Sequence, residues 1–155
     1  YVQKTCAEMR INMKINTKYF GTIDIGDEKI IHFDNGIPGF DEYKDFTILY
    51  DIDAEERPFF SWLQSVEEKN LAFPVVNPFN VDKEYNPVVE DELLAPLGGI
   101  TPENMVVLLL ATIPNDIKET SVNMKAPLII NSDNRKGMQI IVENDKYQIK
   151  HKILG

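Results

Sequence analysis

The sequence contains few of the residues from which catalytic and metal sites are usually built. Its 155 residues include one cysteine and two histidines. A single cysteine, Cys6, cannot form an internal disulfide, a zinc ribbon or a redox pair. His32 and His151 have no cysteine or carboxylate neighbours at metal-ligand spacing. GxSxG, phosphate-loop, GxGxxG and EF-hand patterns are absent. We therefore predict a protein that is not an enzyme and that has no catalytic residues, metal or cofactor.

Basic residues and long apolar runs are also scarce. Lys and Arg number 16 against 25 Asp and Glu, which gives a formal net charge of −9. Because phosphate neutralisation requires clustered Lys and Arg, we expect no direct nucleic-acid partner and favour a basic protein partner. No apolar run approaches the roughly 18 residues that cross a bilayer, and the chain does not begin with a signal-peptide pattern. These absences favour a cytoplasmic protein without a membrane partner.

The length predicts a single domain. Residues 1–12 show neither clean alternation nor a helical stripe, whereas a strand-like alternation starts at Met13. We therefore expect residues 1–12 to be an N-terminal extension or an expression remnant, and residues 13–155 to form one β domain.

Aromatic residues are concentrated in residues 59–79, which include Trp62, the only tryptophan. Residues 59–66 and 71–76 have strand composition, and the polar residues 67–70 between them predict a hairpin with a four-residue loop. Since each aromatic side chain buries about 150–250 Å², we expect this hairpin, with Trp62 and Phe73, to lie in the core.

The other apolar segments are short and regularly spaced. Residues 19–33 predict a second hairpin that turns at Gly26 and Asp27, and the continuous apolar run 105–113 predicts the most buried strand. Further strand-like segments cover residues 46–50, 121–124, 127–131, 138–142 and 147–152. Strands about ten residues apart without long amphipathic helices between them favour an antiparallel arrangement.

Helices are expected only as single turns. Residues 90–97, followed by two glycines, predict one helical turn, and Thr101 followed by a proline predicts a second at residues 101–104. Gly36 and Gly39 bracket Pro38, which predicts a tight turn with positive φ at the glycines. The predicted fold class is mostly β: a small antiparallel β-barrel or sandwich with one or two short helices.

Four segments of the sequence together resemble the flagellar assembly factor family, FliW. They are INTKYFGTIDI at 15–25, IIHFDNGIPGF at 30–40, FFSWLQSVEEKNLAFPVVNPF at 59–79 and NMKAPLIINSDNRKGMQ at 123–139. The resemblance implies a non-enzymatic β-barrel-like chaperone that binds flagellin in the cytoplasm. It also implies binding to CsrA, a basic dimeric RNA-binding protein that represses flagellin translation. Unsecreted flagellin would occupy such a protein and release CsrA.

The two implied partners suggest two kinds of surface. A basic CsrA would fit an acidic surface, which we place in residues 82–92 in preference to residues 51–56; the candidates are Asp82, Glu84, Glu90, Asp91 and Glu92. Amphipathic flagellin ends would fit an apolar groove; the candidates are Ile37, Phe40 and Phe79. The alternative is a small-ligand barrel whose cavity is lined by the aromatic hairpin, although side chains are expected to fill the interior of a barrel of this size.

Overall fold

The computed structural model describes residues 12–50 and 59–153, in which the regular structure consists mainly of short strands. The strands are β1 (Asn12–Asn16), β2 (Thr22–Gly26), β3 (Ile31–Phe33), β4 (Asp45–Leu49), β5 (Phe60–Ser65), β6 (Ala72–Val76), β7 (Met105–Thr112), β8 (Ser121–Val122), β9 (Leu128–Asn131), β10 (Lys136–Gln139) and β11 (His151–Lys152). The helical turns are η1 (Asp27–Lys29), η2 (Pro78–Asn80), α2 (Asp91–Leu94), η3 (Ala95–Leu97) and η4 (Ile117–Glu119). The acidic candidates of residues 51–56 lie outside the described residues.

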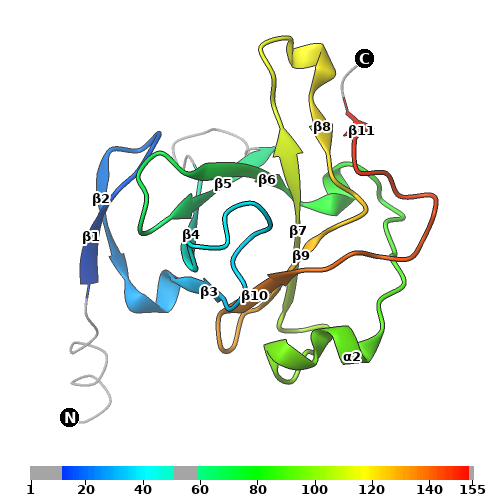
Figure 1. Cartoon of the computed structure of the whole chain (residues 1–155), viewed down its shortest axis with the longest axis horizontal. Coiled ribbons are helices and arrows are strands. Elements are labelled where there is room, and N and C mark those ends of the chain that lie inside the picture. The colour runs from blue at the N-terminus through cyan, green and yellow to red at the C-terminus, as the bar shows by residue number, and fades with distance from the viewer. Residues whose placement is uncertain (1–11, 51–58, 154–155) are drawn as a thin grey trace.

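Seven strands close into a barrel (Figure 1). Their order is β3-β4-β5-β6-β7-β9-β10, and the ring closes because β10 pairs with β3 while β7 pairs with β9. Neighbouring strands in this ring are antiparallel except for β3 and β10, which are parallel. The predicted fold class is therefore confirmed, with one parallel pair inside an otherwise antiparallel barrel.

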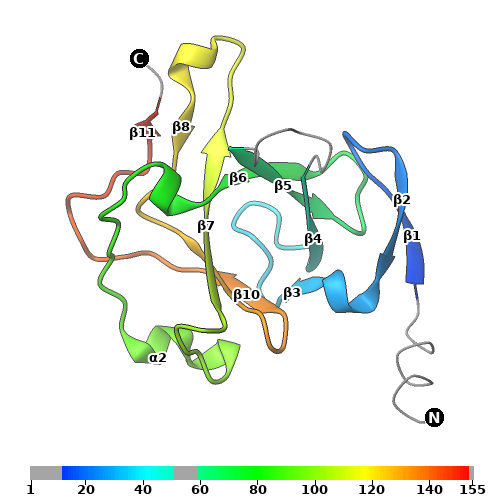
Figure 2. The same ribbon diagram turned by 180° about the vertical axis from the view of Figure 1, so that it is seen from behind.

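Two smaller sheets extend from the barrel (Figures 1 and 2). The far end of β7 pairs with β8, and β8 pairs with β11, so that three strands project beyond the barrel wall. On the other side of the molecule, β1 and β2 form a separate antiparallel hairpin. The α2 turn lies at the opposite end of the molecule from this hairpin.

The barrel interior is filled by side chains from the barrel strands and from the turn after β3, which together we call the inner core. It consists of the buried residues Ile31, Phe33, Ile37, Phe46, Leu63, Val75, Leu128 and Ile130. The rings of Phe33 and Phe46 meet edge to face at 5.6 Å, an arrangement favoured by their quadrupoles. In the small-ligand alternative, the ligand cavity would have to occupy the space that the inner core fills. The packing therefore leaves this alternative without support.

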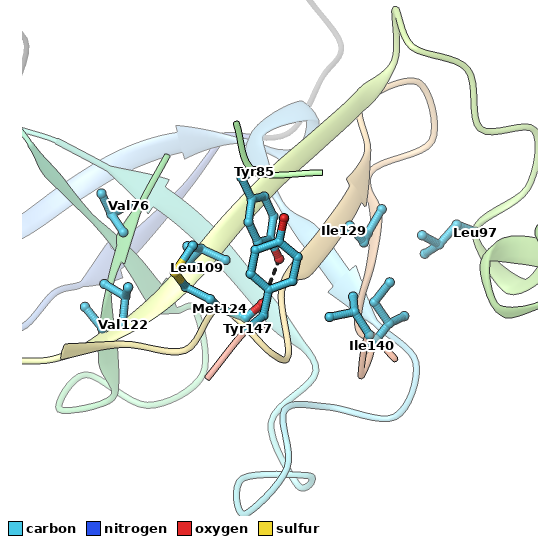
Figure 3. Close-up of a cluster of buried hydrophobic side chains, with 11 residues drawn as sticks. Val76, Tyr85, Leu97, Leu109, Val122, Met124, Ile129, Ile140 and Tyr147 are labelled. Carbon is cyan, nitrogen blue, oxygen red and sulfur yellow. Dashed lines mark hydrogen bonds between the residues drawn. The ribbon is translucent and has the colours of Figure 1, made fainter. Parts of the chain in front are cut away.

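A second apolar cluster, the outer core, covers the outside of the barrel wall at β6, β7 and β9 (Figure 3). Its buried residues are Val76, Tyr85, Leu97, Leu109, Ala111, Val122, Met124, Ile129, Ile140, Val142 and Tyr147. Many of them come from irregular segments that connect the strands, so these segments are held to the barrel by apolar burial.

Strand β7 separates the two cores. Leu108 and Leu110 pack against the inner core, while Val107, Leu109 and Ala111 belong to the outer core or pack on it. Both faces of the strand are therefore apolar, which accounts for the continuous run in the sequence. The prediction that this run is the most buried strand is wrong. Its first two side chains, Met105 and Val106, are 39% and 37% exposed, whereas every residue of β9 is buried.

Two of the local predictions are wrong. Residues 19–33 do not form a hairpin, because β2 pairs with β1 while β3 pairs with β4 and β10. The η1 turn between β2 and β3 leads the chain from one sheet to the other. Residues 101–104 form a hydrogen-bonded turn and not a helix, whereas α2 and η3 occupy the predicted helical turn at 90–97.

The aromatic hairpin pairs as predicted, but its aromatic rings are not its buried part. Strands β5 and β6 are antiparallel neighbours, and their fully buried apolar side chains are Leu63, Val75 and Val76. Trp62 and Phe73 are only half-buried. Trp62 instead packs on Tyr19 of the β1–β2 turn, with ring centroids 4.3 Å apart.

A buried glutamine reinforces the contact between the β1–β2 turn and the barrel. Gln64 is 1% exposed, and its Oε1 accepts a hydrogen bond of 3.0 Å from the backbone N–H of Lys18. Its Nε2 donates to the carbonyl of Lys69 in the β5–β6 loop at 3.0 Å. The β1–β2 hairpin is therefore attached to the barrel through Trp62 and Gln64.

This attachment predicts a local effect of Trp62→Ala. We expect backbone amides of β1 and β2 to exchange with solvent faster in the variant, because the ring contact with Tyr19 is lost. The free energy of unfolding should fall by less than the roughly 3–5 kcal/mol typical of a buried aromatic. Hydrogen exchange measured by NMR or mass spectrometry tests this. Phe59→Ala, at an aromatic that packs on Phe60 instead, is the control. Equal exchange in the two variants would contradict the attachment.

The turn at Gly36 to Gly39 is a structural element, as predicted. Gly36 has φ +65° and Gly39 has φ +88°, a region that residues with a Cβ rarely adopt. A Cβ on Gly36 would lie 2.5 Å from the Cα of Asp41, whereas a Cβ on Gly39 would meet no atom within 4 Å. The turn also places Ile37 in the inner core.

The two glycines therefore predict unequal costs of substitution by alanine. Gly39→Ala should lower the free energy of unfolding by about 1–2 kcal/mol through the left-handed backbone alone. Gly36→Ala should cost at least about 1 kcal/mol more, because the backbone of Asp41 must also move. Denaturant titration of both variants gives the comparison. Equal losses would show that the close approach to Asp41 is relieved without cost.

Candidate protein-binding cleft

An apolar cleft of about 310 Å³ lies on the outside of the barrel where β7 meets β9. One side of the cleft, which we call the floor, is formed by Met105 and Val107 of β7 and by Ile129 of β9. Val107 and Ile129 are paired residues of the two strands. The cleft is lined by Pro78, Phe79, Tyr85, Asn86, Pro87, Val89, Leu94, Met105, Val107 and Ile129. Such a volume is at the lower end of the roughly 300–1,000 Å³ typical of binding pockets.

The other side of the cleft, residues 78–94, is an irregular segment that we call the wall. Two tyrosines, whose rings contact each other at a tilt of 55°, hold its centre in place (Figure 3). The rings of Tyr85 and Tyr147 are 4.7 Å apart. The hydroxyl of Tyr85 donates to the Met124 carbonyl at 2.9 Å, and the hydroxyl of Tyr147 accepts from the Asn86 N–H at 2.8 Å. The wall is therefore fixed to the outer core by directed hydrogen bonds as well as by burial.

The end of the wall, where α2 leads into η3, is fixed by two asparagines. Nδ2 of Asn131 and Nδ2 of Asn134 both donate to the Leu97 carbonyl, at 2.9 and 2.8 Å. Gly98, with φ +84°, then ends the helical turn. These contacts connect the wall to β9 and to the turn that follows it.

All five acidic candidates lie in the wall. Asp82 is half-buried, and Glu84, Glu90, Asp91 and Glu92 are exposed. The Oδ1 of Asp82 accepts from the Glu84 N–H at 2.9 Å. Within residues 12–50 and 59–153, none of the five is in an ion pair. The acidic candidates thus lie in the segment that forms one side of an apolar cleft, between residues that line the cleft.

The three groove candidates do not lie together. Phe79 lines the cleft and is 54% exposed. Phe40 is 40% exposed, but it packs edge to face on Phe73 at 5.2 Å and does not line the cleft. The prediction that Ile37 is an exposed groove residue is wrong, because it is 2% exposed and belongs to the inner core. Of the three, only Phe79 belongs to the wall, which also carries the acidic candidates.

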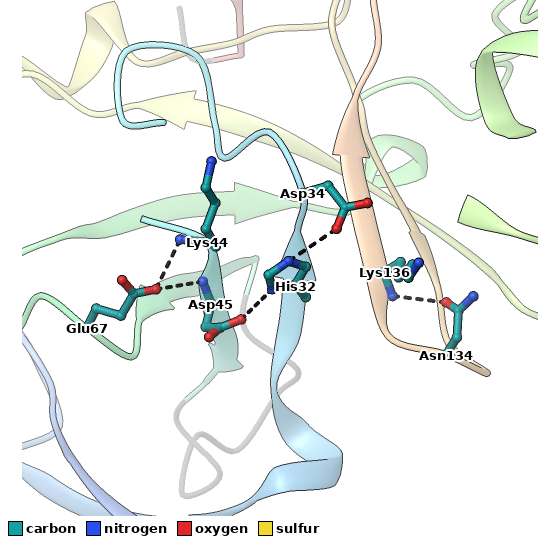
Figure 4. A network of polar contacts seen from close by, with 7 residues as sticks. All are labelled: His32, Asp34, Lys44, Asp45, Glu67, Asn134 and Lys136. Carbon is teal, nitrogen blue, oxygen red and sulfur yellow. Dashed lines mark hydrogen bonds and ion pairs between the residues drawn. The ribbon is translucent and has the colours of Figure 1, made fainter. Parts of the chain in front are cut away.

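His32 lies in a polar network on β3 and β4 (Figure 4). Its Nδ1 is 2.8 Å from Oδ1 of Asp45, and its Nε2 is 3.1 Å from Oδ1 of Asp34. His32 is therefore an exposed strand residue whose ring is within hydrogen-bond distance of Asp45. The carboxylate of Asp45 was not foreseen from spacing in the sequence, because it comes from the neighbouring strand. In the part of the chain that the structure describes, no three His, Cys, Asp or Glu residues form a cluster that could hold a metal ion.

The whole barrel and the cleft lie within the region of similarity to a known family. The sequence matches the family described as FliW protein over residues 14–153. The chain belongs to the FliW family. The resemblance inferred from the four sequence segments is therefore confirmed.

Two relatives support the FliW assignment over almost their full length. A protein of Lachnoclostridium phytofermentans is 48% identical over 141 residues, covering 91% of this chain and 90% of the relative. A protein of Lachnospira eligens is 45% identical over 142 residues, covering 91% and 94%. Both relatives are named "Flagellar assembly factor FliW", which describes an assembly factor and not an enzyme.

The FliW fold is also shared with a solved structure. A crystal structure of the flagellar assembly factor FliW superposes with a TM-score of 0.81 at 33% sequence identity. The superposition covers 92% of this chain and 98% of the other. Among the described residues of this FliW chain, no helix is long and apolar enough to span a membrane.

The floor of the cleft was missed by the sequence reasoning. Met105, Val107 and Ile129 belong to apolar runs, which sequence alone assigns to a core. A usable signal is present in the wall, where Tyr85, Val89 and other apolar residues interrupt an acidic stretch. Such a pattern indicates a segment with one side against the protein and the other in water.

Tyr85 generates a prediction with a pH dependence. Burial, and secondarily the adjacent Tyr147, raise the pKa of the Tyr85 phenol well above its ordinary value of 10.0. Above pH 10.0, the ordinary pKa, the phenol ionises in the unfolded chain while it stays neutral in the folded chain. The free energy of unfolding therefore falls as the pH rises above this value. At neutral pH, Tyr85→Phe should cost about 1–2 kcal/mol, since the Met124 carbonyl loses its donor.

Urea unfolding of wild type and Tyr85→Phe at neutral pH and above pH 10 tests both effects. The gap between the two proteins should narrow at alkaline pH. Tyr50→Phe, at an exposed position, is the matched control and should unfold like wild type. A gap that stays constant over the whole pH range would contradict the stated role of burial.

Proposed function

We propose that this protein is a non-enzymatic flagellar assembly factor that acts in the cytoplasm by binding flagellin and CsrA. Flagellin that is not yet secreted would occupy the protein and release CsrA to repress flagellin translation. The observation that carries this proposal is membership of the FliW family across residues 14–153. Relatives that carry the name of flagellar assembly factor support it.

The charge distribution supports a basic partner. The chain has a formal net charge of −9, and the acidic candidates of the wall are not in ion pairs within the described ranges. Opposite charge on a partner would accelerate association and would favour that partner over acidic competitors. CsrA, as the basic partner, is therefore assigned to the wall.

Exposed apolar side chains support an amphipathic partner. Phe40 and Phe79 are both exposed, and an amphipathic helix binds through apolar side chains that enter a groove. Flagellin is therefore assigned to an apolar surface that includes one of these two residues.

Co-purification from a flagellated host tests the proposed function directly. The tagged protein should retain flagellin and CsrA in stoichiometric amounts, as measured by quantitative mass spectrometry. An unrelated acidic β-protein with the same tag is the control. Retention of neither partner above the control would overturn the proposal.

Reversal of the acidic wall predicts a selective loss of CsrA. The variant with Glu90→Lys, Asp91→Lys and Glu92→Lys should bind CsrA more weakly, and the remaining binding should depend less on salt. Screening acts over about 8–10 Å at ordinary ionic strength, so it weakens charge attraction but not apolar burial. Flagellin binding should be nearly unchanged. Titration calorimetry at several salt concentrations gives both quantities.

The matched control carries the same number of charge reversals elsewhere. Asp24→Lys, Asp27→Lys and Asp41→Lys change exposed residues that do not line the cleft. This variant should bind CsrA nearly as well as wild type. If the wall variant lost flagellin and kept CsrA, the two assignments would have to be exchanged.

A further inference from the structure

Large apolar side chains remain exposed at the cleft. Phe79 and Met105 line it and are 54% and 39% exposed. Val88 and Leu93, which are sequence neighbours of the lining residues Val89 and Leu94, are exposed as well. Single exposed apolar side chains are ordinary, but several gathered around one hollow indicate a surface that another molecule covers.

The cleft is formed without a partner. Tyr85 and Asn86 are held by the hydrogen bonds to Met124 and Tyr147, and the Val88 N–H donates to Oδ1 of Asn144 at 2.6 Å. A partner would therefore not have to order this segment on binding, which lowers the entropy cost of association.

The segments that supply most of the cleft lining are acidic. Residues 78–107, which supply the wall and the β7 side, contain six acidic residues and one lysine, namely Asp82, Glu84, Glu90, Asp91, Glu92, Glu103 and Lys83. Two lysines close to Asn144 and Tyr147 already have contacts. Nζ of Lys125 donates to the Asn144 carbonyl at 3.2 Å, and Nζ of Lys146 lies 5.1 Å from the centroid of the Tyr147 ring.

We infer that the cleft and the acidic wall are one docking site, which takes a protein segment that inserts apolar side chains and carries lysine or arginine beside them. This inference rests on the proposed function in that the occupant is a protein. Apolar anchors fit Phe79 and Met105, and the flanking cations meet the carboxylates of the wall. Charge and apolar burial at this site thus act on the same occupant, which leaves Phe40 as the apolar candidate for flagellin.

Other occupants fit the cleft less well. A second copy of the chain would bring a net charge of −9 against the same acidic wall. A polar small molecule would find few groups to bind, because the polar side chains of the lining are Asn86 and Tyr85, and the Tyr85 hydroxyl already donates to Met124. The combination of an apolar floor with an acidic wall selects a basic amphipathic segment.

A synthetic peptide provides the probe. It has about 18 residues with leucine at helical spacing and lysine at the other positions, and the control peptide has glutamate in place of lysine. Fluorescence anisotropy with the full chain should show binding of the lysine peptide, weaker at higher salt, and little binding of the glutamate peptide. Absence of binding by the lysine peptide, or equal binding of both peptides, would overturn the inference.

Two variants of the site separate its apolar and charged parts. Phe79→Ala with Met105→Ala, and independently Glu90→Gln with Glu92→Gln, should each weaken binding of the lysine peptide at least about tenfold. The apolar variant should keep the salt dependence, whereas the neutralised variant should lose much of it. If either variant bound the peptide as wild type does, the two parts would not form one site.

The matched controls change equivalent residues away from the cleft. Ile117→Ala with Ile149→Ala removes two exposed apolar side chains, and Asp24→Asn with Asp27→Asn removes two exposed carboxylates. Both should bind the peptide within about twofold of wild type. Comparable losses in the controls would show that net charge or nonspecific apolar contact explains the binding, and would overturn the inference.

Failure of this inference can be told apart from failure of the proposed function. If the wild-type chain co-purifies with flagellin and CsrA and both site variants still do so, the proposed function stands and the docking site is wrong. If the wild type retains neither protein but binds the lysine peptide in the cleft, the docking site stands and the proposed partners are wrong.

Discussion

Strand β7 has to be apolar on both faces, and the rest of the structure depends on this constraint. The strand lies between the inner and outer cores and pairs with β6, β8 and β9. Its pairing with β9 closes the barrel. The outward side chains of the same pair, Val107 and Ile129, form the floor of the cleft. The same pair of strands, β7 and β9, therefore closes the barrel and presents the binding surface.

Local features of the fold could be predicted from the sequence because their causes lie within a few residues. The β5–β6 hairpin follows from two strand-like segments around a polar loop, and Gly98 ends a helical turn through its positive φ. The partner of β2 could not be predicted in this way. Gly26 and Asp27 resemble a hairpin turn, but Thr17 and Gly21 form the turn that is used, with both the N–H and the hydroxyl of Thr17 donating to the Gly21 carbonyl.

Only the part of the candidate site that follows from residue type could be predicted from the sequence. Charged side chains stay in water unless they are paired, so the exposure of Glu90 to Glu92 follows from residue type alone. The side to which a turn residue points does not follow from residue type, and Ile37 fills the barrel interior for this reason. Apolar residues of a core and of a cleft floor also look the same in sequence. The cleft exists because Tyr85 and Tyr147, far apart in the chain, meet over β7 and β9.

The parallel pair of β3 and β10 has a consequence for the order of folding. Phe33 pairs with Gly137, about one hundred residues further along the chain. Hairpins such as β1–β2 and β5–β6 can form as soon as they are synthesised, but β3 has no partner on that side until β10 has left the ribosome. Contacts of such long sequence separation also slow folding in general. During synthesis, the apolar inner faces of the first four barrel strands therefore stay uncovered until the last third of the chain emerges.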